Sequence, residues 1–198
     1  MPQIPRVLLF FVALCAAVRA VPACAQAMTV FGGGSYAQEC YMTAAVAARL
    51  HFAGRGDLKS CNMALQNASL SQHDLAATYV NRGVIYMAMT RYDDAASDYA
   101  KAVALEPRSG VVYVNRGNLS FIGKDYRSAV ADYSKAISLG VSADHIAYYN
   151  RGMAYEHLGD LALAERDYRR AIKLSPQWPK PRARLDILLF KVSQGAGN

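Results

Sequence analysis

Three five-residue segments decide how this chain folds: Tyr-Val-Asn-Arg-Gly at 79–83, the same residues at 113–117, and Tyr-Tyr-Asn-Arg-Gly at 148–152. Their glycines lie 34 and 35 residues apart. After each glycine, an Ala, an Asp-Tyr pair and a second Ala recur at fixed distances. These residues are Ala95, Asp98, Tyr99 and Ala102, then Ala129, Asp132, Tyr133 and Ala136, then Ala164, Asp167, Tyr168 and Ala171. A repeat of this period predicts supersecondary units that stack on one another.

Each copy has the pattern of two helices joined by a short polar turn. In the first copy, Tyr79, Gly83 and Tyr86 share one face at helical spacing, and Ala95 and Tyr99 share another. The small residues allow the two helices to approach closely, and the large Tyr fills the space beside them. We therefore expect an all-α fold, a right-handed α-solenoid of antiparallel helix pairs.

This pattern resembles the tetratricopeptide repeat, in which aromatic, Gly, Ala and Pro residues stand at these spacings. Pro107 and Pro176 close the first and third copies, whereas Val141 takes that place in the second. Because the second copy also has one extra residue near Asp144, its turn into the third is expected to be irregular. Residues 56–58 lie in register with 159–161 and indicate a degenerate unit before the three clear ones.

The resulting organisation has eight segments. We predict a signal peptide at 1–27, a flexible mature N-terminus at 28–35, a degenerate helix pair at 36–75, three repeats at 76–109, 110–144 and 145–178, a capping helix at 179–192 and a disordered tail at 193–198. In the capping helix, Leu185, Leu188, Leu189 and Val192 are expected to cover the last repeat.

The N-terminus has the pattern of a secretory signal peptide. Arg6 precedes Val7–Val18, a run of twelve apolar residues, and Ala25 and Ala27 end two cleavage motifs. Twelve residues are too few for a helix to cross a hydrocarbon core of ~30 Å. We therefore expect an exported, periplasmic protein of a bacterial envelope, with lipid attachment through Cys24 as the alternative.

Two cysteines, Cys40 and Cys61, remain after the predicted cleavage. An oxidising compartment favours a disulfide between them. A straight first helix over 36–52 would place Cys40 ~18 Å from the end of that helix, too far for a bond to the returning helix. A disulfide therefore predicts a broken or displaced first helix, and two reduced core thiols are the other reading.

The Arg and the Asp of each copy recur together. We predict ion pairs between the two helices of each unit: Arg82 with Asp98, Arg116 with Asp132, and Arg151 with Asp167. The alternative is a row of free guanidinium groups that binds an anionic ligand. Since every Arg comes with its own acid, the structural pairing is favoured.

The resemblance implies that the first helices border a concave groove that binds a peptide or a helix. Carried over position by position, the groove residues are Val80, Val84, Met87, Val114, Asn115, Asn118, Phe121, Tyr149, Asn150, Met153, Glu156 and His157. Some members of the family bind a C-terminal carboxylate through groove lysines, asparagines and an arginine. Here Val80, Val84, Ile146 and Asn150 replace residues of that set, which argues against carboxylate capture. Packing of the groove residues against a neighbouring helix is the alternative for all twelve.

Composition and motifs exclude most kinds of chemistry. The net charge of +7 falls to +5 without Arg6 and Arg19, and no dense basic block predicts nucleic-acid binding. The four histidines lack metal-ligand spacing, and no phosphate loop or catalytic triad is present. We expect no enzyme activity, cofactor, small-molecule substrate or stable membrane span. The predicted function is a protein-interaction scaffold, and a constitutive subunit or accessory factor of an envelope complex is the alternative.

Overall fold

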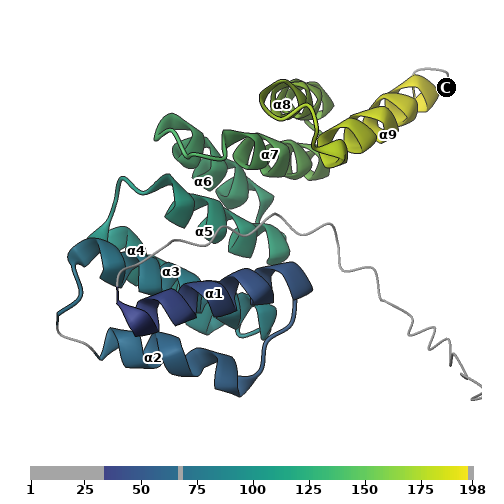
Figure 1. Ribbon diagram of the computed structural model, residues 1–198. Coiled ribbons are helices and arrows are strands. Elements are labelled where there is room, and N and C mark those ends of the chain that lie inside the picture. The colour runs from purple at the N-terminus through teal and green to yellow at the C-terminus, as the bar shows by residue number, and fades with distance from the viewer. Residues whose placement is uncertain (1–33, 67–68, 196–198) are drawn as a thin grey trace, which may run out of the picture.

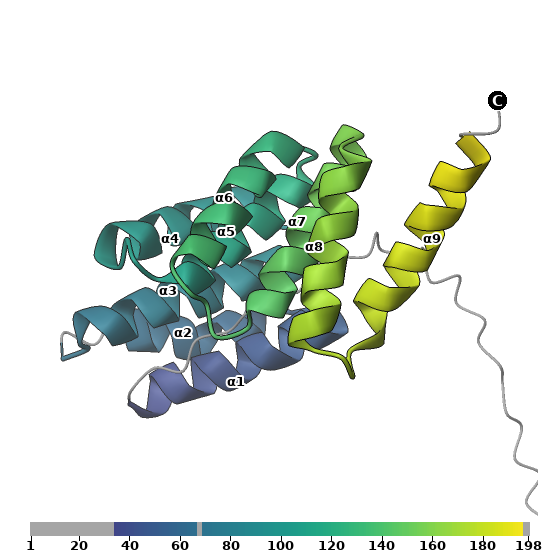
Figure 2. The ribbon, with the colours of Figure 1, turned by 90° about the horizontal axis from the view of Figure 1, so that it is seen from above.

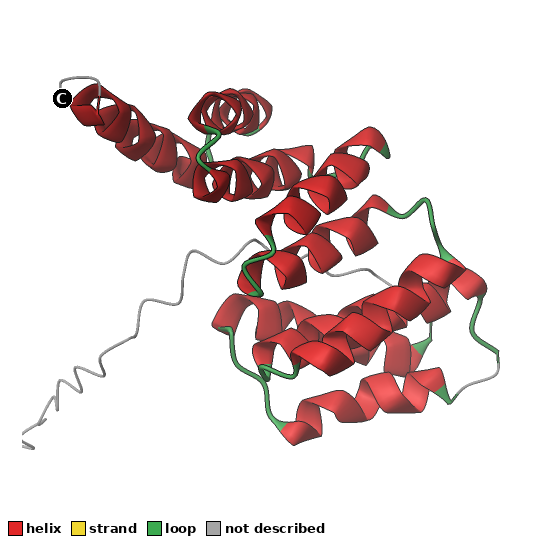
Figure 3. Ribbon diagram, turned by 180° about the vertical axis from the view of Figure 1, so that it is seen from behind, coloured by secondary structure: helices red, strands yellow, loops and turns green. Residues whose placement is uncertain are grey.

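The computed structural model describes residues 34–66 and 69–195, so the predicted signal peptide, residues 28–33 and the last three residues lie outside it. Within the described residues the chain is helical and contains no β-strand (Figure 3), which confirms the all-α prediction. The elements are α1 (Ser35–Leu50), the 3₁₀-helix η1 (Arg55–Leu58), α2 (Lys59–Leu65), α3 (Gln72–Ala88), α4 (Tyr92–Leu105), α5 (Gly110–Ile122), α6 (Tyr126–Ser138), α7 (Asp144–Leu158), α8 (Leu161–Leu174) and α9 (Pro179–Gly195).

The helices form a stack of antiparallel pairs (Figure 1). The repeated segments form α3–α4, α5–α6 and α7–α8, with α1–α2 before them and α9 after them. The turn inside each repeated pair has a residue with positive φ, seven positions after the repeat glycine: Thr90 (60°), Lys124 (63°) and Gly159 (84°). One left-handed residue reverses the chain and starts the second helix, so the three pairs share one turn geometry.

Packing of a tyrosine onto a glycine joins the two helices of each pair. Tyr99, Tyr133 and Tyr168 have exposed fractions of 1% or less. A Cβ atom added at Gly117 would lie 2.7 Å from Tyr133 Cε1, and one added at Gly152 would lie 2.7 Å from Tyr168 Cε1. The ring therefore occupies the space that any larger residue would need, as the spacing predicts.

The connection between the second and third repeated pairs differs from the preceding one. Residues 139–143 join α6 to α7, and Gly140 adopts a positive φ of 71°. Val141, which stands where the other two copies have Pro, is buried with Tyr113 and Ala147. The missing proline is thus replaced by a core side chain.

The N-terminal pair departs from the repeat, because α1 ends at Leu50 and residues 51–58 lead back along it to α2. Arg49, which aligns with the repeat glycines, is exposed. Cys40 and Cys61 form a disulfide with their Cα atoms 4.7 Å apart, and α1 is unbroken. Of the two consequences predicted for a disulfide, a broken first helix is wrong, and the first helix is instead displaced from the repeat register. Eight connecting residues at up to ~3.3 Å each cover the ~15 Å from Leu50 back to the level of Cys40.

Removal of the disulfide is expected to loosen the N-terminal pair selectively. The face of α1 that packs on α3 consists of small residues, Ala44 and Ala47 among them, so dispersion contacts there are few. In a Cys40→Ser/Cys61→Ser variant, amide exchange in α1 and α2 should therefore rise by at least about tenfold while α5–α8 keep their protection. Hydrogen–deuterium exchange by mass spectrometry measures this, and an equal rise in all helices would contradict it.

The C-terminal helix is longer and less covered than predicted. It continues to Gly195 and so includes three residues assigned to the disordered tail, and the Ser193 hydroxyl donates to the Phe190 carbonyl in its last turn. Leu185 and Leu188 are buried against α8, as expected. Leu189 and Val192 are exposed (38% and 43%), which corrects the prediction for these two. α9 extends away from α8 at this end of the stack (Figure 2), so the last turns lack a cover.

Candidate partner-binding surface

Each repeat arginine holds its aspartate through two parallel hydrogen bonds. Nε and Nη2 donate at 2.7 and 2.8 Å for Arg82 to Asp98, at 2.9 and 2.6 Å for Arg116 to Asp132, and at 2.7 and 2.9 Å for Arg151 to Asp167. The hydrogen bond to Asp132 raises the pKa of Arg116. Because the guanidinium groups are paired in this way, they link the helices of each unit and do not form a free row for an anion.

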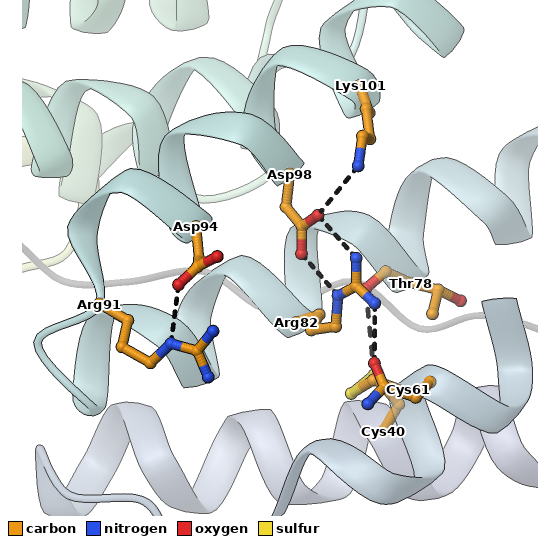
Figure 4. A network of polar contacts seen from close by, with 9 residues as sticks. Cys40, Cys61, Thr78, Arg82, Arg91, Asp94, Asp98 and Lys101 are labelled. Atoms are coloured by element: carbon orange, nitrogen blue, oxygen red, sulfur yellow. Dashed lines mark hydrogen bonds and ion pairs between the residues drawn. A yellow bond between two sulfur atoms is a disulfide. The ribbon is translucent and has the colours of Figure 1, made fainter. Parts of the chain in front are cut away.

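Two of these arginines also bind the preceding unit. Figure 4 shows the pair of Arg82 with Asp98. Nη1 of Arg82 also donates to Asn62 Oδ1 at 2.7 Å, and Nη1 of Arg151 donates to Ser134 Oγ at 2.9 Å. One repeat before Ser134 stands Ala100, which has no acceptor to offer Arg116. Arg116 has the most exposed side chain of the three, at 39%, compared with 13% for Arg151.

A buried amide connects the second and third units. Oδ1 of Asn118 accepts from the Tyr133 hydroxyl at 2.9 Å and from Nδ2 of Asn150 at 3.0 Å. The first partner lies in the same unit and the second in the next one. Asn118 and Asn150 were predicted to face a groove, but here they satisfy one another in the interior.

Nine of the twelve predicted groove residues are buried, which corrects the prediction for them because a buried side chain cannot line an open groove. They are Val80, Val84, Val114, Asn115, Asn118, Phe121, Tyr149, Asn150 and Met153, all with exposed fractions of 7% or less. The cause is close stacking of successive units: Val80 shares a core cluster with Val112 of α5, and Phe121 shares one with Met153 of α7. Met87 and Glu156 are half-buried and His157 is exposed.

Glu156 is the attachment point of α9. Its carboxylate accepts from the Tyr168 hydroxyl at 2.9 Å, from Arg184 Nε at 2.8 Å and from Lys191 Nζ at 3.2 Å. Burial by itself would raise the pKa of Glu156, but the Tyr168 hydrogen bond and the two cations outweigh it and lower that pKa. Glu156 therefore holds the capping helix and does not present its charge to a partner.

Acid should weaken this attachment. Because the pKa of Glu156 is lower in the folded chain than its ordinary value of 4.5, its contribution to stability is complete above 4.5 and is lost as the pH falls through the folded-state pKa. Glu156→Gln should therefore lower the melting temperature at neutral pH, and the difference from wild type should shrink below pH 4.5.

Thermal melts across this pH range measure the effect. Glu165→Gln is the matched control, because Glu165 forms an exposed pair with Arg169 one turn away and should give little change at any pH. A difference between Glu156→Gln and wild type that stays constant through acid pH would contradict the attachment role.

Aromatic side chains remain at the surface beside the buried core. Tyr126 and His157 stack in parallel with ring centroids 4.5 Å apart, and Phe121 lies edge-on at 5.4 Å from each ring. We call the pair Tyr126 and His157, which contacts the buried ring of Phe121, the aromatic ledge. Tyr126 was missed in the sequence analysis, although Tyr92 stands one repeat before it and gave a signal. Aromatic side chains of this kind supply much of the energy of protein interfaces.

In the described part of the chain, no group of three or more His, Cys, Asp or Glu residues could hold a metal ion. None of the described helices combines the length and the apolar character needed to cross a membrane. One open pocket, of about 360 Å³, is lined by His145, Ile146, Ser175, Gln177 and Trp178. Another, of about 540 Å³, lies between the start of α1 and Ser60.

Comparison with protein families gives two matches. Models described as the tetratricopeptide repeat match residues 76–109 and residues 145–177. A search of curated proteins gave no match.

Solved structures of similar architecture include two TPR domains and one pilus biogenesis factor. The first TPR domain of human RPAP3 has 26% identity and a TM-score of 0.60, and the match covers 65% of this chain and 99% of that one. The first TPR of Spaghetti (RPAP3), bound to the HSP90 peptide SRMEEVD, has 27% identity, coverage of 60% and 96%, and a TM-score of 0.58. PilW, a type IV pilus biogenesis factor, has 20% identity, coverage of 82% and 72%, and a TM-score of 0.68, which is a likeness of fold.

Proposed function

The chain is a tetratricopeptide-repeat protein, and from this premise we propose that it is a non-catalytic interaction scaffold of the bacterial cell envelope whose aromatic ledge binds a peptide or a helix. The observation that carries the proposal is the stacked pair Tyr126 and His157, which stays at the surface while most of the neighbouring first-helix residues are buried. A similar domain binds an HSP90 peptide, which supports a peptide partner.

The polar residues of the repeats support a role without catalysis. The repeat arginines and aspartates form ion pairs with one another, and these pairs hold the helices together. General acid–base or nucleophilic catalysis needs titratable groups that converge on a cleft. Three of the described histidines have other contacts: the ring of His157 stacks on Tyr126, His73 pairs with Glu106 on the surface, and His145 lies edge-on to Trp178.

Two observations support the envelope location. The first 27 residues have the signal-peptide pattern, and Cys40 and Cys61 form a disulfide of the kind that persists in oxidising compartments. Anchoring through a lipid on Cys24 is the alternative form of export.

If the aromatic ledge binds a protein, substitution of both its residues should abolish most of that binding. Tyr126→Ala/His157→Ala should reduce the amount of co-purified envelope protein by at least about tenfold, because removal of two interface aromatics costs at least ~1.4 kcal/mol of binding free energy. Affinity capture from envelope extracts, followed by quantitative mass spectrometry, measures this. Tyr92→Ala is the matched control. Tyr92 occupies the position of Tyr126 in the preceding repeat, but the residue that corresponds to His157 for that pair is Ile122, so no stacked pair forms. An equal loss with Tyr92→Ala, or no loss with the ledge variant, would contradict the proposal.

The alternative function is a constitutive subunit of an envelope complex. It is favoured by one face of α1, where Met42, Val46 and Leu50 are 56%, 45% and 59% exposed at helical spacing. An apolar face of this kind is normally covered. A partner at fixed stoichiometry that survives high salt favours the subunit, and a salt-labile, substoichiometric partner favours the transient scaffold.

A further inference from the structure

Residues 187–192 of α9 have apolar side chains on more than one face, with Lys191 as their only charged residue, and most of these apolar side chains are uncovered. Ile187 and Phe190 are 47% and 65% exposed and lie on the side away from the buried Leu185. Leu189 and Val192 continue the side of the buried leucines, beyond the part that α8 covers, and are also exposed. Helices of soluble solenoid caps present a polar outer face to water, so this composition indicates a further contact.

α9 is fixed to the stack by side-chain contacts and projects from it. Glu156 fixes Arg184 and Lys191, so α9 is held at a defined position while its end projects from the stack (Figures 1 and 2). Neither pocket described above is lined by a residue of α9. A projecting apolar helix fits a surface that it can enter, whereas a bound peptide needs a concave surface to receive it.

The charge around this projecting helix is strongly positive. On α8 and α9, five exposed basic residues lie outside the ion pairs described above: Arg166, Arg170, Lys173, Lys180 and Arg182. The acids of the same two helices are fewer, because Glu165 pairs with Arg169 and Asp167 with Arg151, which leaves Asp186. This surplus attracts an anionic surface.

We propose that α8 and α9 dock the protein peripherally on an anionic lipid surface, with Ile187 and Phe190 entering the interface and the basic side chains facing the headgroups. A second copy of this chain fits less well, because two ends of the same sign repel one another. The proposal goes beyond the scaffold function and does not depend on the aromatic ledge. It assigns this end of the solenoid to the membrane surface and leaves the ledge available to a protein.

Vesicle co-sedimentation of the full-length chain tests the docking. Binding is expected to vesicles that contain phosphatidylglycerol, to weaken at high salt, and to be weaker on pure phosphatidylcholine. Ile187→Glu/Phe190→Glu should lower the affinity by at least about tenfold, because each charge near an anionic surface changes affinity by roughly fivefold. All variants share residues 1–33, so any binding by that segment is the same in every sample.

Met42→Glu/Val46→Glu is the matched control, because these residues are equally exposed on α1 at the other end of the stack. This variant should bind like wild type, and Lys180→Glu/Arg182→Glu should bind anionic vesicles less well. Circular dichroism melts establish that the exposed substitutions leave the fold intact. Wild-type protein that sediments with neither kind of vesicle, or equally with both, overturns the proposal. So does an Ile187→Glu/Phe190→Glu variant with undiminished binding.

Discussion

Gly152→Ala is expected to lower the free energy of unfolding by about 3 kcal/mol. The added Cβ would lie 2.7 Å from Tyr168 Cε1 and 3.3 Å from the Ala164 carbonyl oxygen. Neither neighbour can move cheaply, because the Tyr168 ring is buried and its hydroxyl donates to Glu156. The better helix propensity of Ala returns about 1 kcal/mol, so the clash itself is larger than the net loss.

Gly123→Ala is the matched control for this substitution. A Cβ at Gly123 would meet only the Leu119 and Ser120 carbonyl oxygens at 3.5 Å, which is ordinary contact, and Gly123 is exposed. Its stability should stay within about 0.5 kcal/mol of wild type. Urea unfolding followed by circular dichroism measures the free energy of unfolding of both variants. If Gly152→Ala is as stable as Gly123→Ala, the packing of Tyr168 does not require a glycine at position 152.

Asp167→Ala is expected to cost about 3–5 kcal/mol of unfolding free energy. The side chain of Asp167 is 1% exposed and that of Arg151 is 13% exposed, so the substitution leaves a guanidinium group largely buried without its carboxylate. Asp132→Ala should cost less, because the side chain of Arg116 is 39% exposed and can be hydrated. The double substitution Arg151→Met/Asp167→Leu should recover most of the loss, since it removes the charge that was left behind.

The exposed pair of Arg91 and Asp94 provides the control for this series. Both side chains are more than two-fifths exposed, so Asp94→Ala should leave the midpoint of urea unfolding unchanged. If Asp167→Ala proved as harmless as Asp94→Ala, the repeat pairs would contribute nothing to the fold, and the conserved spacing of Arg and Asp within this chain would need another explanation.

The repeated pairs could be predicted from sequence because their rules are local. The separation of Gly152 and Tyr168 is the same as that of Gly117 and Tyr133, and a large side chain opposite a glycine packs in one way. The Arg and Asp of a unit lie in register for the same reason. Once the period was known, the helices and their contacts followed from the positions of these residues.

The accessible surface could not be predicted in the same way. Position within a repeat does not distinguish a first-helix residue that lines a groove from one that packs on the next unit, because this depends on how closely successive units approach. Val84 is buried because α1 covers it, and α1 does not follow the repeat register. Glu156 is occupied because Arg184 and Lys191 come from α9, a helix outside the repeats.

The binding role of the aromatic ledge is tested most directly by photocrosslinking in cells. A photoreactive phenylalanine analogue at His157 should give one discrete adduct with an envelope protein, because this position is exposed on the ledge. The same analogue at Ala131, exposed on the second helix of the middle pair, should give none. Adducts of equal yield at both positions, or only at Ala131, would contradict the account.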